Sequence, residues 1–579
     1  MDIILLSPPV ANFGQCSSGL SVLTAYLRHR GWDAHQWDLA IDAFHHFHSP
    51  EYLSECLRRL EGAGPGAAKA REVARRVIVD IEAAKDALRR PGVERDTDTM
   101  RWAFETINDA GIVMTAASLG AFEHDFRHFG IRDAFRSYES LGAAIGDPER
   151  NPFLDFFREH ALPRLIAARP RAVGLSLTYF SQVLPGLTLA RLIKAALPET
   201  HLILGGAYLT ATEHDTETIP CELVPADAII LHDGEEGLDQ WLSLVLRGEG
   251  AAESIANCYL PAGRTFRRAG ARNIAHTDLA RLPSPLWIAD GLELDKYLVP
   301  KYPIPLPLSR GCYWGRCNYC NISCQTVALY RTRPPELALE DMRAAIAETG
   351  SNWFDFPVDS YRPKELHALA RAVIDAGLDI EWGAEVLLDP GFLREGVVAD
   401  LARSGCRTLR FGLESACEET LQAMNKPTRP KKARRLLGLC KQHGIQTACM
   451  LIAGYPTETQ RQLYQTYDYL VENSDRIDFL TIHQYSLVHG SPMAQDPAAH
   501  GLIVLPQEAV LWTSIPFQNT NPVGMRNEDL PEVVEAMKEG LKEHYPDLGE
   551  LWTVAIGGWM TFPACCGVRR ELVHPVGGG

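Results

Sequence analysis

The sequence predicts an α/β protein with two parallel sheets in series, a Rossmann-like doubly wound domain followed by a partial TIM-type (β/α)6 barrel. Short apolar runs such as Ile3–Leu6 show no polar alternation, which is typical of strands buried on both faces of a parallel sheet. Segments with apolar residues at three- and four-residue spacing separate these runs and predict covering helices. Glycine or a polar residue follows most runs, so the strand ends are expected to form ligand-binding edges.

Composition sets broad limits on function. The chain has 579 residues, 46% of them hydrophobic and 22% charged, which is an ordinary globular composition. Its formal net charge of −16 argues against nucleic acid as a partner. No apolar run approaches the ~20 residues of a membrane span. The start Met1-Asp-Ile-Ile is not basic and is interpreted as a strand rather than a signal peptide, so the 14 cysteines are expected in the reducing cytoplasm without disulfides.

The first domain is predicted to span residues 1–240. Its strands are expected at Ile3–Leu6, Trp32–Leu39, Ala172–Leu177, His201–Gly206 and Ala228–Leu231, with helices at Leu20–Arg30 and Pro185–Leu197. Between about 50 and 165 the pattern becomes wholly helical, with helices predicted at Tyr52–Leu60, Ala67–Leu88, Thr99–Asn108 and Phe153–Ala168. This stretch is interpreted as a helical insertion.

Residues 241–300 are predicted to be a linker with a small hairpin, 301–495 the partial barrel, and 496–579 a small mixed α+β or helical domain related to substrate. The barrel strands are expected at Ile304–Ser309, Trp353–Val358, Glu381–Val386, Thr408–Gly412, Thr447–Ile452 and Phe479–Gln484. Helices such as Pro363–Ala376 and Lys431–His443 lie between them. In such barrels the chemistry occurs at the carboxyl ends of the strands.

Three cysteines, Cys312, Cys317 and Cys320, follow the first predicted barrel strand. Three nearby thiolates can hold three irons of a 4Fe–4S cluster and leave the fourth iron open to a ligand. A structural zinc site is the alternative, but zinc sites usually use two cysteine pairs and the remaining pair, Cys565-Cys566, is adjacent. Cys324 offers a competing triad with Cys317 and Cys320.

This stretch resembles the cluster loop of radical S-adenosylmethionine (SAM) enzymes, whose usual spacing is C-x3-C-x-aromatic-C. The chain has one extra residue between the first two cysteines, and Tyr319 occupies the aromatic position, which the resemblance places near the adenine. Phe356-Pro-Val-Asp-Ser, Phe411-Gly-Leu-Glu-Ser and Met450-Leu-Ile-Ala-Gly resemble the family's strand-end motifs, in that order. The resemblance implies SAM contacts at Asp359, Ser360, Glu385, Glu414, Ser415, Ile452 and Gly454.

The strand ends of the first domain resemble the cobalamin-binding domain that precedes many radical SAM enzymes. Glycine there lets backbone approach a large flat ligand, and no G-x-G-x-x-G dinucleotide motif follows the first strand. The string Asp33-Ala-His35 lacks the glycine of D-x-H-x-x-G, so cobalamin without a histidine on cobalt is expected. The implied contacts are Pro8, Pro9, Ser176, Leu177, Thr178, Tyr179, Gly205, Gly206, Tyr208, Gly234 and Glu235.

The resemblance implies a methyltransferase that uses a 4Fe–4S cluster, SAM and cobalamin to methylate an unactivated carbon of a peptide or natural product. A low-potential electron donor such as flavodoxin or ferredoxin is the implied partner. A cyclase or rearrangement enzyme with the same cofactors, and a non-catalytic cobalamin or Fe–S sensor, are the alternatives. Cys565 and Cys566 are interpreted either as core thiols or as a hydrogen-atom donor or substrate contact in the active site. His45, His46 and His48 are interpreted as a partly exposed surface patch rather than a metal site.

Overall fold

The computed structural model describes residues 1–579 except 126–127, 271–273, 289–291, 323–328, 358–359, 547 and 549–579. The predicted contacts Asp359, Cys324, Cys565 and Cys566 therefore lie outside the described residues. The chain forms two compact units. The first contains 1–90, 98–300 and 508–512, and the second contains 91–97, 301–507 and 513–579.

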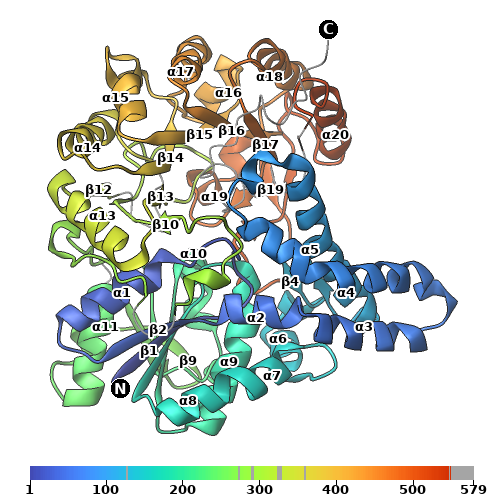
Figure 1. Ribbon diagram of the computed structural model, residues 1–579, viewed down its shortest axis with the longest axis vertical. Coiled ribbons are helices and arrows are strands. Elements are labelled where there is room, and N and C mark those ends of the chain that lie inside the picture. Colours follow the sequence, from blue (N-terminus) through green and yellow to red (C-terminus); the bar gives the residue numbers. More distant parts are fainter. Residues whose placement is uncertain are drawn as a thin grey trace. The chain divides into compact units, whose positions relative to one another are not determined.

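The first unit is built on a seven-stranded sheet in the order β2-β1-β5-β6-β7-β8-β9 (Figure 1). Its first five strands pair in parallel, as the apolar runs predict, and the last two form an antiparallel hairpin at the edge. The hairpin lies within the stretch 241–300 and extends the sheet. The bounds are β1 Ile3–Ser7, β2 Ala34–Asp38, β5 Ala172–Ser176, β6 His201–Gly205, β7 Ala228–Ile230, β8 Cys258–Ala262 and β9 Thr265–Arg268.

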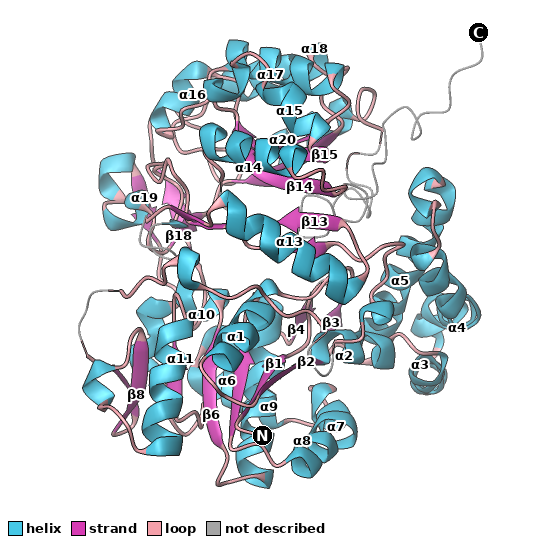
Figure 2. Ribbon diagram, turned by 60° about the vertical axis from the view of Figure 1, so that its left-hand side comes forward, coloured by secondary structure: helices cyan, strands magenta, loops and turns pink. Residues whose placement is uncertain are grey.

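Helices cover both faces of this sheet, so the doubly wound prediction is confirmed. Helices α1 (Ser18–His29) and α11 (Glu235–Leu242) pack on one face, and α9 (Val183–Ala196) lies on the other (Figure 2). The α1/α11 side buries the large rings of Trp32 and Trp241 with aliphatic strand side chains. Each such buried side chain contributes about 1.5–3 kcal/mol to folding.

The insertion is helical, as predicted, and contains α3 Pro50–Gly62, α4 Ala68–Arg89, α5 Thr97–Ala117 and α6 Tyr138–Gly146. Helix α5 is longer than the predicted Thr99–Asn108 and continues through Gly111 to Ala117. A Cβ on Gly111 would lie 2.9 Å from the Cα of Asp125, so this glycine allows the helix to pack closely against the following segment.

The second unit carries six parallel strands in the order β10-β13-β14-β15-β16-β17, which confirms the partial barrel (Figure 1). Their bounds are β10 Ile304–Pro305, β13 Trp353–Phe356, β14 Glu381–Leu387, β15 Cys406–Glu414, β16 Gln446–Ala453 and β17 Phe479–Gln484. The covering helices include α13 Pro335–Thr349, α14 Pro363–Asp375, α15 Val397–Arg403, α16 Glu418–Ala423, α17 Pro430–Gln442, α18 Gln460–Glu472 and α20 Leu530–Leu541.

The first barrel strand differs from the prediction. Instead of one strand over Ile304–Ser309, the chain forms the short β10 and then β11 (Ser309–Arg310), which pairs antiparallel with β12 (Arg331–Thr332). Pro305 and Pro307 lack the backbone N–H that a continuous ladder requires. The strand ends early, and the cysteine loop leaves from the small β11/β12 ladder.

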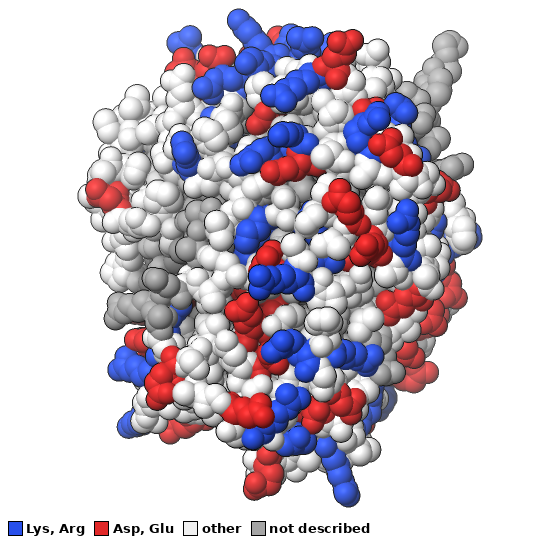
Figure 3. All heavy atoms as spheres, turned by 90° about the vertical axis from the view of Figure 1, so that its left-hand side faces the viewer, with Lys and Arg blue, Asp and Glu red and all other residues white. Residues whose placement is uncertain are grey.

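Cationic and anionic side chains are interspersed on the surface drawn in Figure 3. None of the helices in the described part of the chain is long and apolar enough to cross a membrane.

Candidate functional site

The three predicted cluster cysteines lie together on the loop after β11. Cys312 forms an isolated parallel bridge with Ser360, so the loop begins beside the end of β13. All three thiols are half-buried. The pKa of Cys320 is raised to about 12, mainly by burial and also by the nearby thiols of Cys317 and Cys312. The thiols therefore lie close enough to interact electrostatically.

The described residues contain no group of three His, Cys, Asp or Glu side chains arranged around a single metal ion. The second cysteine pair of the structural zinc alternative, Cys565-Cys566, lies outside the described residues, so that alternative is not tested. A 4Fe–4S cluster instead requires thiolates at separate corners of a cube, bound to different irons. A half-buried loop with three neighbouring thiols fits such a cluster.

The turn after α16 holds the cysteine loop in place. The backbone N–H of Asn318 donates to the carbonyl of Met424 at 3.0 Å, and its side-chain amide donates to the carbonyl of Ala423 at 2.8 Å. The indole N–H of Trp314 donates to the carbonyl of Asn425 at 2.8 Å. These bonds order a loop that has one residue more than the usual family spacing.

A buried ion pair lies beside the loop. Lys426 Nζ is 2.7 Å from Glu414 Oε1 and 3.3 Å from the hydroxyl of Tyr319. Only 6% of Lys426 and 8% of Glu414 is exposed. A Cβ on Gly412 would lie 2.6 Å from Glu414 Oε1 and 2.8 Å from Lys426 Nζ, so a side chain at this position would displace the ends of both charged side chains. Sequence reasoning missed Lys426, because nothing in the sequence indicates that it meets Glu414.

The other predicted barrel contacts have partners within the second unit. Ser360 Oγ accepts the backbone N–H of Leu387 at 3.2 Å, and Ser415 Oγ lies 3.1 Å from Thr466 Oγ1. Glu385 is in register with Arg410 on the adjacent strand β15. Ile452 lies near the end of β16 and Gly454 follows the strand, where a Cβ on Gly454 would lie 2.3 Å from the side chain of Leu530 on α20. Their contacts to SAM remain predictions.

In the first unit, Gln182 joins the loops after β1 and β5. Its side-chain Oε1 accepts the backbone N–H groups of Thr178 and Tyr179 at 2.8 and 3.1 Å. Its Nε2 donates to Ser7 Oγ at 3.2 Å and to the carbonyl of Pro8 at 2.6 Å. This fully buried glutamine thus fixes Pro8, Thr178 and Tyr179, three of the six contacts predicted on these two loops, although no sequence pattern singles it out.

The glycine pair at the end of β6, Gly205 and Gly206, is explained by packing within the chain. A Cβ on Gly206, whose φ is +114°, would lie 2.3 Å from the carbonyl oxygen of Leu177. A Cβ on Gly205 would lie 2.8 Å from the carbonyl oxygen of Ile230. The glycines allow the loops after β5, β6 and β7 to meet tightly, so they need no ligand to explain them.

A short segment from beyond the barrel packs on this edge. The hydroxyl of Tyr208 donates to the carbonyl of Leu511 at 3.0 Å, and the N–H of Leu511 donates to Asp215 Oδ2 at 2.6 Å. The rings of Trp512 and Phe180 meet edge to face with centroids 4.6 Å apart. Sequence reasoning assigned this segment to the C-terminal domain, whereas it packs with the first unit.

The neighbouring histidines serve the fold. His45 Nε2 lies 2.8 Å from the carbonyl of Lys296, and His48 Nδ1 lies 2.9 Å from the carbonyl of Phe44. The predicted surface patch is wrong for His48, which is 1% exposed because its ring stacks on Phe44 in the core.

Residues 306–470 match the model of the Radical SAM superfamily. This segment is a radical SAM domain. Along 99% of the chain and 98% of the other chain, the fold is similar to that of TsrM from Kitasatospora setae, a radical SAM methyltransferase solved with cobalamin and a [4Fe–4S] cluster (TM-score 0.59, 13% identity). The radical SAM domain and the preceding doubly wound unit therefore share the architecture of that enzyme.

Two curated relatives match parts of the chain. An uncharacterised methyltransferase of Pyrococcus horikoshii is 25% identical over 301 residues, 51% of this chain and 63% of the relative. Hopanoid C-3 methylase of Methylococcus capsulatus is 26% identical over 376 residues, 62% of this chain and 63% of the relative. The matched segments span under two thirds of either relative.

Proposed function

We propose that this protein is a cobalamin-dependent radical SAM methyltransferase that methylates an unactivated carbon of a peptide or natural product. The observation that carries the proposal is the correspondence of fold with TsrM along 99% of the chain, combined with the radical SAM domain. The methyltransferase and methylase names of the two curated relatives support it.

The residues of the barrel have defined parts in this proposal. Cys312, Cys317 and Cys320 would hold the cluster. When bound, the reduced cluster would supply the electron that cleaves SAM to methionine and a 5′-deoxyadenosyl radical able to remove a substrate hydrogen, and cobalamin would carry the methyl group that a second SAM supplies. The Lys426–Glu414 pair places a fixed cation and a carboxylate beside that loop, and Lys426 orients the Tyr319 hydroxyl.

The first unit would hold cobalamin at the carboxyl edge of its sheet, where open α/β sheets bind ligands. Gln182 fixes the loops after β1 and β5 at that edge before any ligand arrives. Donors and acceptors that are already fixed bind with a smaller loss of conformational entropy. Substrate specificity is assigned to the helical insertion and the C-terminal segment, and electron supply to a flavodoxin or ferredoxin in the cytoplasm.

Anaerobic reconstitution with iron, sulfide and cobalamin tests the proposal. The full-length protein is expected to bind about four irons and four sulfides. It is also expected to form both 5′-deoxyadenosine and S-adenosylhomocysteine over a panel of peptide and small-molecule substrates. The Cys317→Ala variant is the matched control and is expected to lack the cluster and both products.

The same products separate the alternatives. A cyclisation or rearrangement would form 5′-deoxyadenosine without S-adenosylhomocysteine, because no methyl group leaves SAM. An intact cluster with bound cobalamin and neither product would contradict catalysis and favour the sensor.

A further inference from the structure

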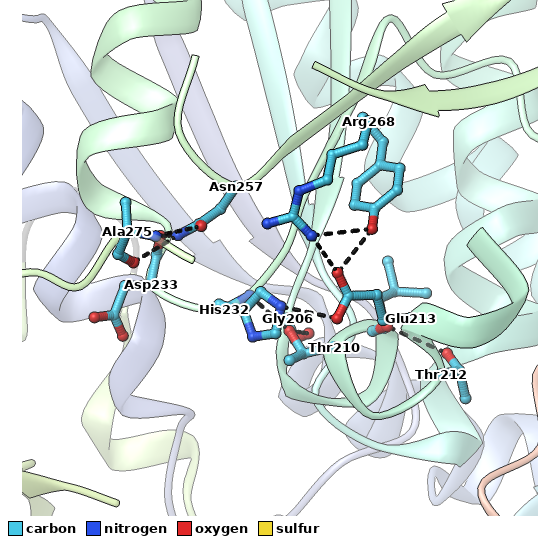
Figure 4. A network of polar contacts seen from close by, with 11 residues as sticks. Gly206, Thr210, Thr212, Glu213, His232, Asp233, Asn257, Arg268 and Ala275 are labelled. Carbon is cyan, nitrogen blue, oxygen red and sulfur yellow. Dashed lines mark hydrogen bonds and ion pairs between the residues drawn. The ribbon is translucent and has the colours of Figure 1, made fainter. Parts of the chain in front are cut away.

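A polar network lies at the carboxyl edge of the first sheet (Figure 4). Glu213 follows β6, His232 is the second residue after β7, and Arg268 is the last residue of β9. Strand β8 is antiparallel to both β7 and β9, so β9 ends at the same edge as β7. Three elements therefore bring an acid, an imidazole and a guanidinium to the edge at which α/β sheets bind ligands.

Glu213 is the centre of the network. Its Oε2 lies 3.0 Å from His232 Nε2, and its Oε1 lies 2.8 Å from an Nη1 of Arg268. The hydroxyl of Tyr259 donates to Oε1 at 2.7 Å. Burial alone would raise the pKa of Glu213, but the hydrogen bonds from His232 and Tyr259 and the charge of Arg268 hold it below its usual value. Glu213 is therefore a carboxylate that accepts from three donors.

This arrangement leaves one edge of the guanidinium unused. Nε and Nη2 of Arg268 are buried and have no hydrogen-bond partner in the described part of the chain. Together they form the side of the guanidinium that binds a carboxylate or phosphate through two parallel hydrogen bonds. Figure 4 shows this edge directed away from Glu213. Buried donors are nearly always satisfied in proteins, so two adjacent unsatisfied donors indicate a group that is still to bind.

His232 offers a hydrogen-bond acceptor, which complements the two donors of Arg268. A carboxylate only accepts hydrogen bonds, so His232 Nε2 carries a proton, and in that tautomer of the ring Nδ1 is an acceptor. Nδ1 is buried without a partner among the described residues. An imidazole fixed by a carboxylate in this way is oriented to accept a hydrogen bond from an incoming hydroxyl.

The backbone holds the imidazole in place. His232 has a φ of +56°, in the left-handed region that a residue with a side chain adopts at a cost. Its N–H donates to Thr210 Oγ1 at 2.8 Å, and the Thr210 hydroxyl donates to the carbonyl of Gly206 at 3.2 Å. The next carbonyl, of Asp233, accepts from Asn257 at 3.0 Å. The strained loop is thus fixed on both sides, as in a preformed binding site.

We propose that Arg268 and His232 form a subsite for a phosphate ester that carries a neighbouring hydroxyl group. The guanidinium edge binds two phosphate oxygens, and His232 Nδ1 accepts from the hydroxyl. The assignment of this ester to cobalamin rests on the proposed function, because the nucleotide tail of cobalamin carries a ribose hydroxyl next to a phosphodiester. A phosphorylated substrate, or free phosphate, is the other source of the same chemistry.

Comparison of cobalamin with cobinamide, which lacks the nucleotide tail, tests the subsite. Both corrinoids are titrated into the full-length protein and followed by absorbance, and inorganic phosphate binding is measured by equilibrium dialysis. Arg268→Gln removes the charged edge and is expected to weaken cobalamin binding by about tenfold or more, as for charge-assisted hydrogen bonds. Cobinamide affinity is expected to stay unchanged, which also shows that the variant is folded.

Arg267→Gln is the matched control, because Arg267 is on the same strand, is 63% exposed on its side chain and pairs with Glu217. It is expected to change neither affinity. If Arg268→Gln loses phosphate binding but keeps cobalamin affinity, the subsite serves a phosphorylated substrate. Unchanged affinity for cobalamin and phosphate, or equal losses for both corrinoids, overturns the subsite. If the wild-type protein binds neither corrinoid, the proposed function fails, and the phosphate titration still decides the subsite.

Discussion

The Lys426–Glu414 pair gives a quantitative prediction. At an N–O distance of 2.7 Å, its Coulomb attraction is about 6 kcal/mol for an effective dielectric constant of ~20. Burial of both charges offsets several kcal/mol of this. Lys426→Met would leave the Glu414 carboxylate buried and unpaired, which is expected to lower the free energy of unfolding by about 3–5 kcal/mol. Glu414→Gln is expected to lower the free energy of unfolding by a similar amount.

The double variant Lys426→Met/Glu414→Gln removes both charges. Its loss in the free energy of unfolding is expected to be far smaller than the sum of the losses in the two single variants, because replacing both members of a buried pair is often nearly neutral. Urea unfolding of the four proteins without cofactors measures this coupling energy. Lys441→Met is the control: Lys441 and Asp475 are both more than half exposed, and the loss is expected to stay below about 1 kcal/mol. A double variant that loses the full sum would refute the reasoning.

The coupling is also expected to be independent of pH between 6 and 9. Burial alone would lower the pKa of Lys426, but Glu414 and the thiols of Cys317 and Cys312 raise it above its ordinary value. A lysine with a raised folded-state pKa contributes stability that is fully present below the unfolded pKa of about 10.4 and is lost as pH rises through the folded pKa. Loss of the coupling near pH 7 would contradict a charged pair.

Three further predictions concern the cluster, a turn and a buried acid. Cys324→Ala is expected to retain the iron and sulfide content of the wild-type protein, whereas Cys317→Ala loses both; equal loss would favour the competing triad. Gly206→Ala is expected to lower the free energy of unfolding by about 2 kcal/mol or more, because its φ is +114° and a backbone oxygen would lie 2.3 Å from the new Cβ. Gly62→Ala is the control, since its Cβ would lie in open space, and denaturant unfolding is expected to show almost no loss for it. Burial raises the pKa of Glu458 to about 7, so stability is expected to fall by about 3 kcal/mol as pH rises from ~4.5 to ~7, and Glu458→Gln removes this slope.

The strands were predictable because strands buried on both faces appear as continuous apolar runs. Ile3–Leu6, for example, is fully or almost fully buried and became β1. The order of strand-end motifs was likewise sufficient to anticipate the radical SAM domain. The prediction of one continuous first barrel strand was wrong because its alternating prolines lack the backbone N–H groups of a regular ladder. The predicted end of α5 was wrong because the helix continues through Gly111, which packs closely against the following segment.

The residues that sequence reasoning missed share a property: their importance depends on contacts with residues distant in the sequence. Gln182 bonds to Ser7 and Pro8, which lie 175 and 174 residues away. Leu511 bonds to Tyr208, which is 303 residues away. Such pairs leave no local periodicity or spacing, so only the folded chain reveals them.

Glycines and unsatisfied polar atoms give different information about the edge of the first sheet. The glycines at 205 and 206 are accounted for by the backbones of Leu177 and Ile230, so they show only that the loops pack closely. The free edge of Arg268 and Nδ1 of His232 have no such explanation within the described residues. Two adjacent buried donors and a buried acceptor that have no partner, the acceptor on a residue with a left-handed φ, indicate where a ligand completes the structure. We therefore expect ligand affinity at this edge to depend more on Arg268 and His232 than on the glycine motif.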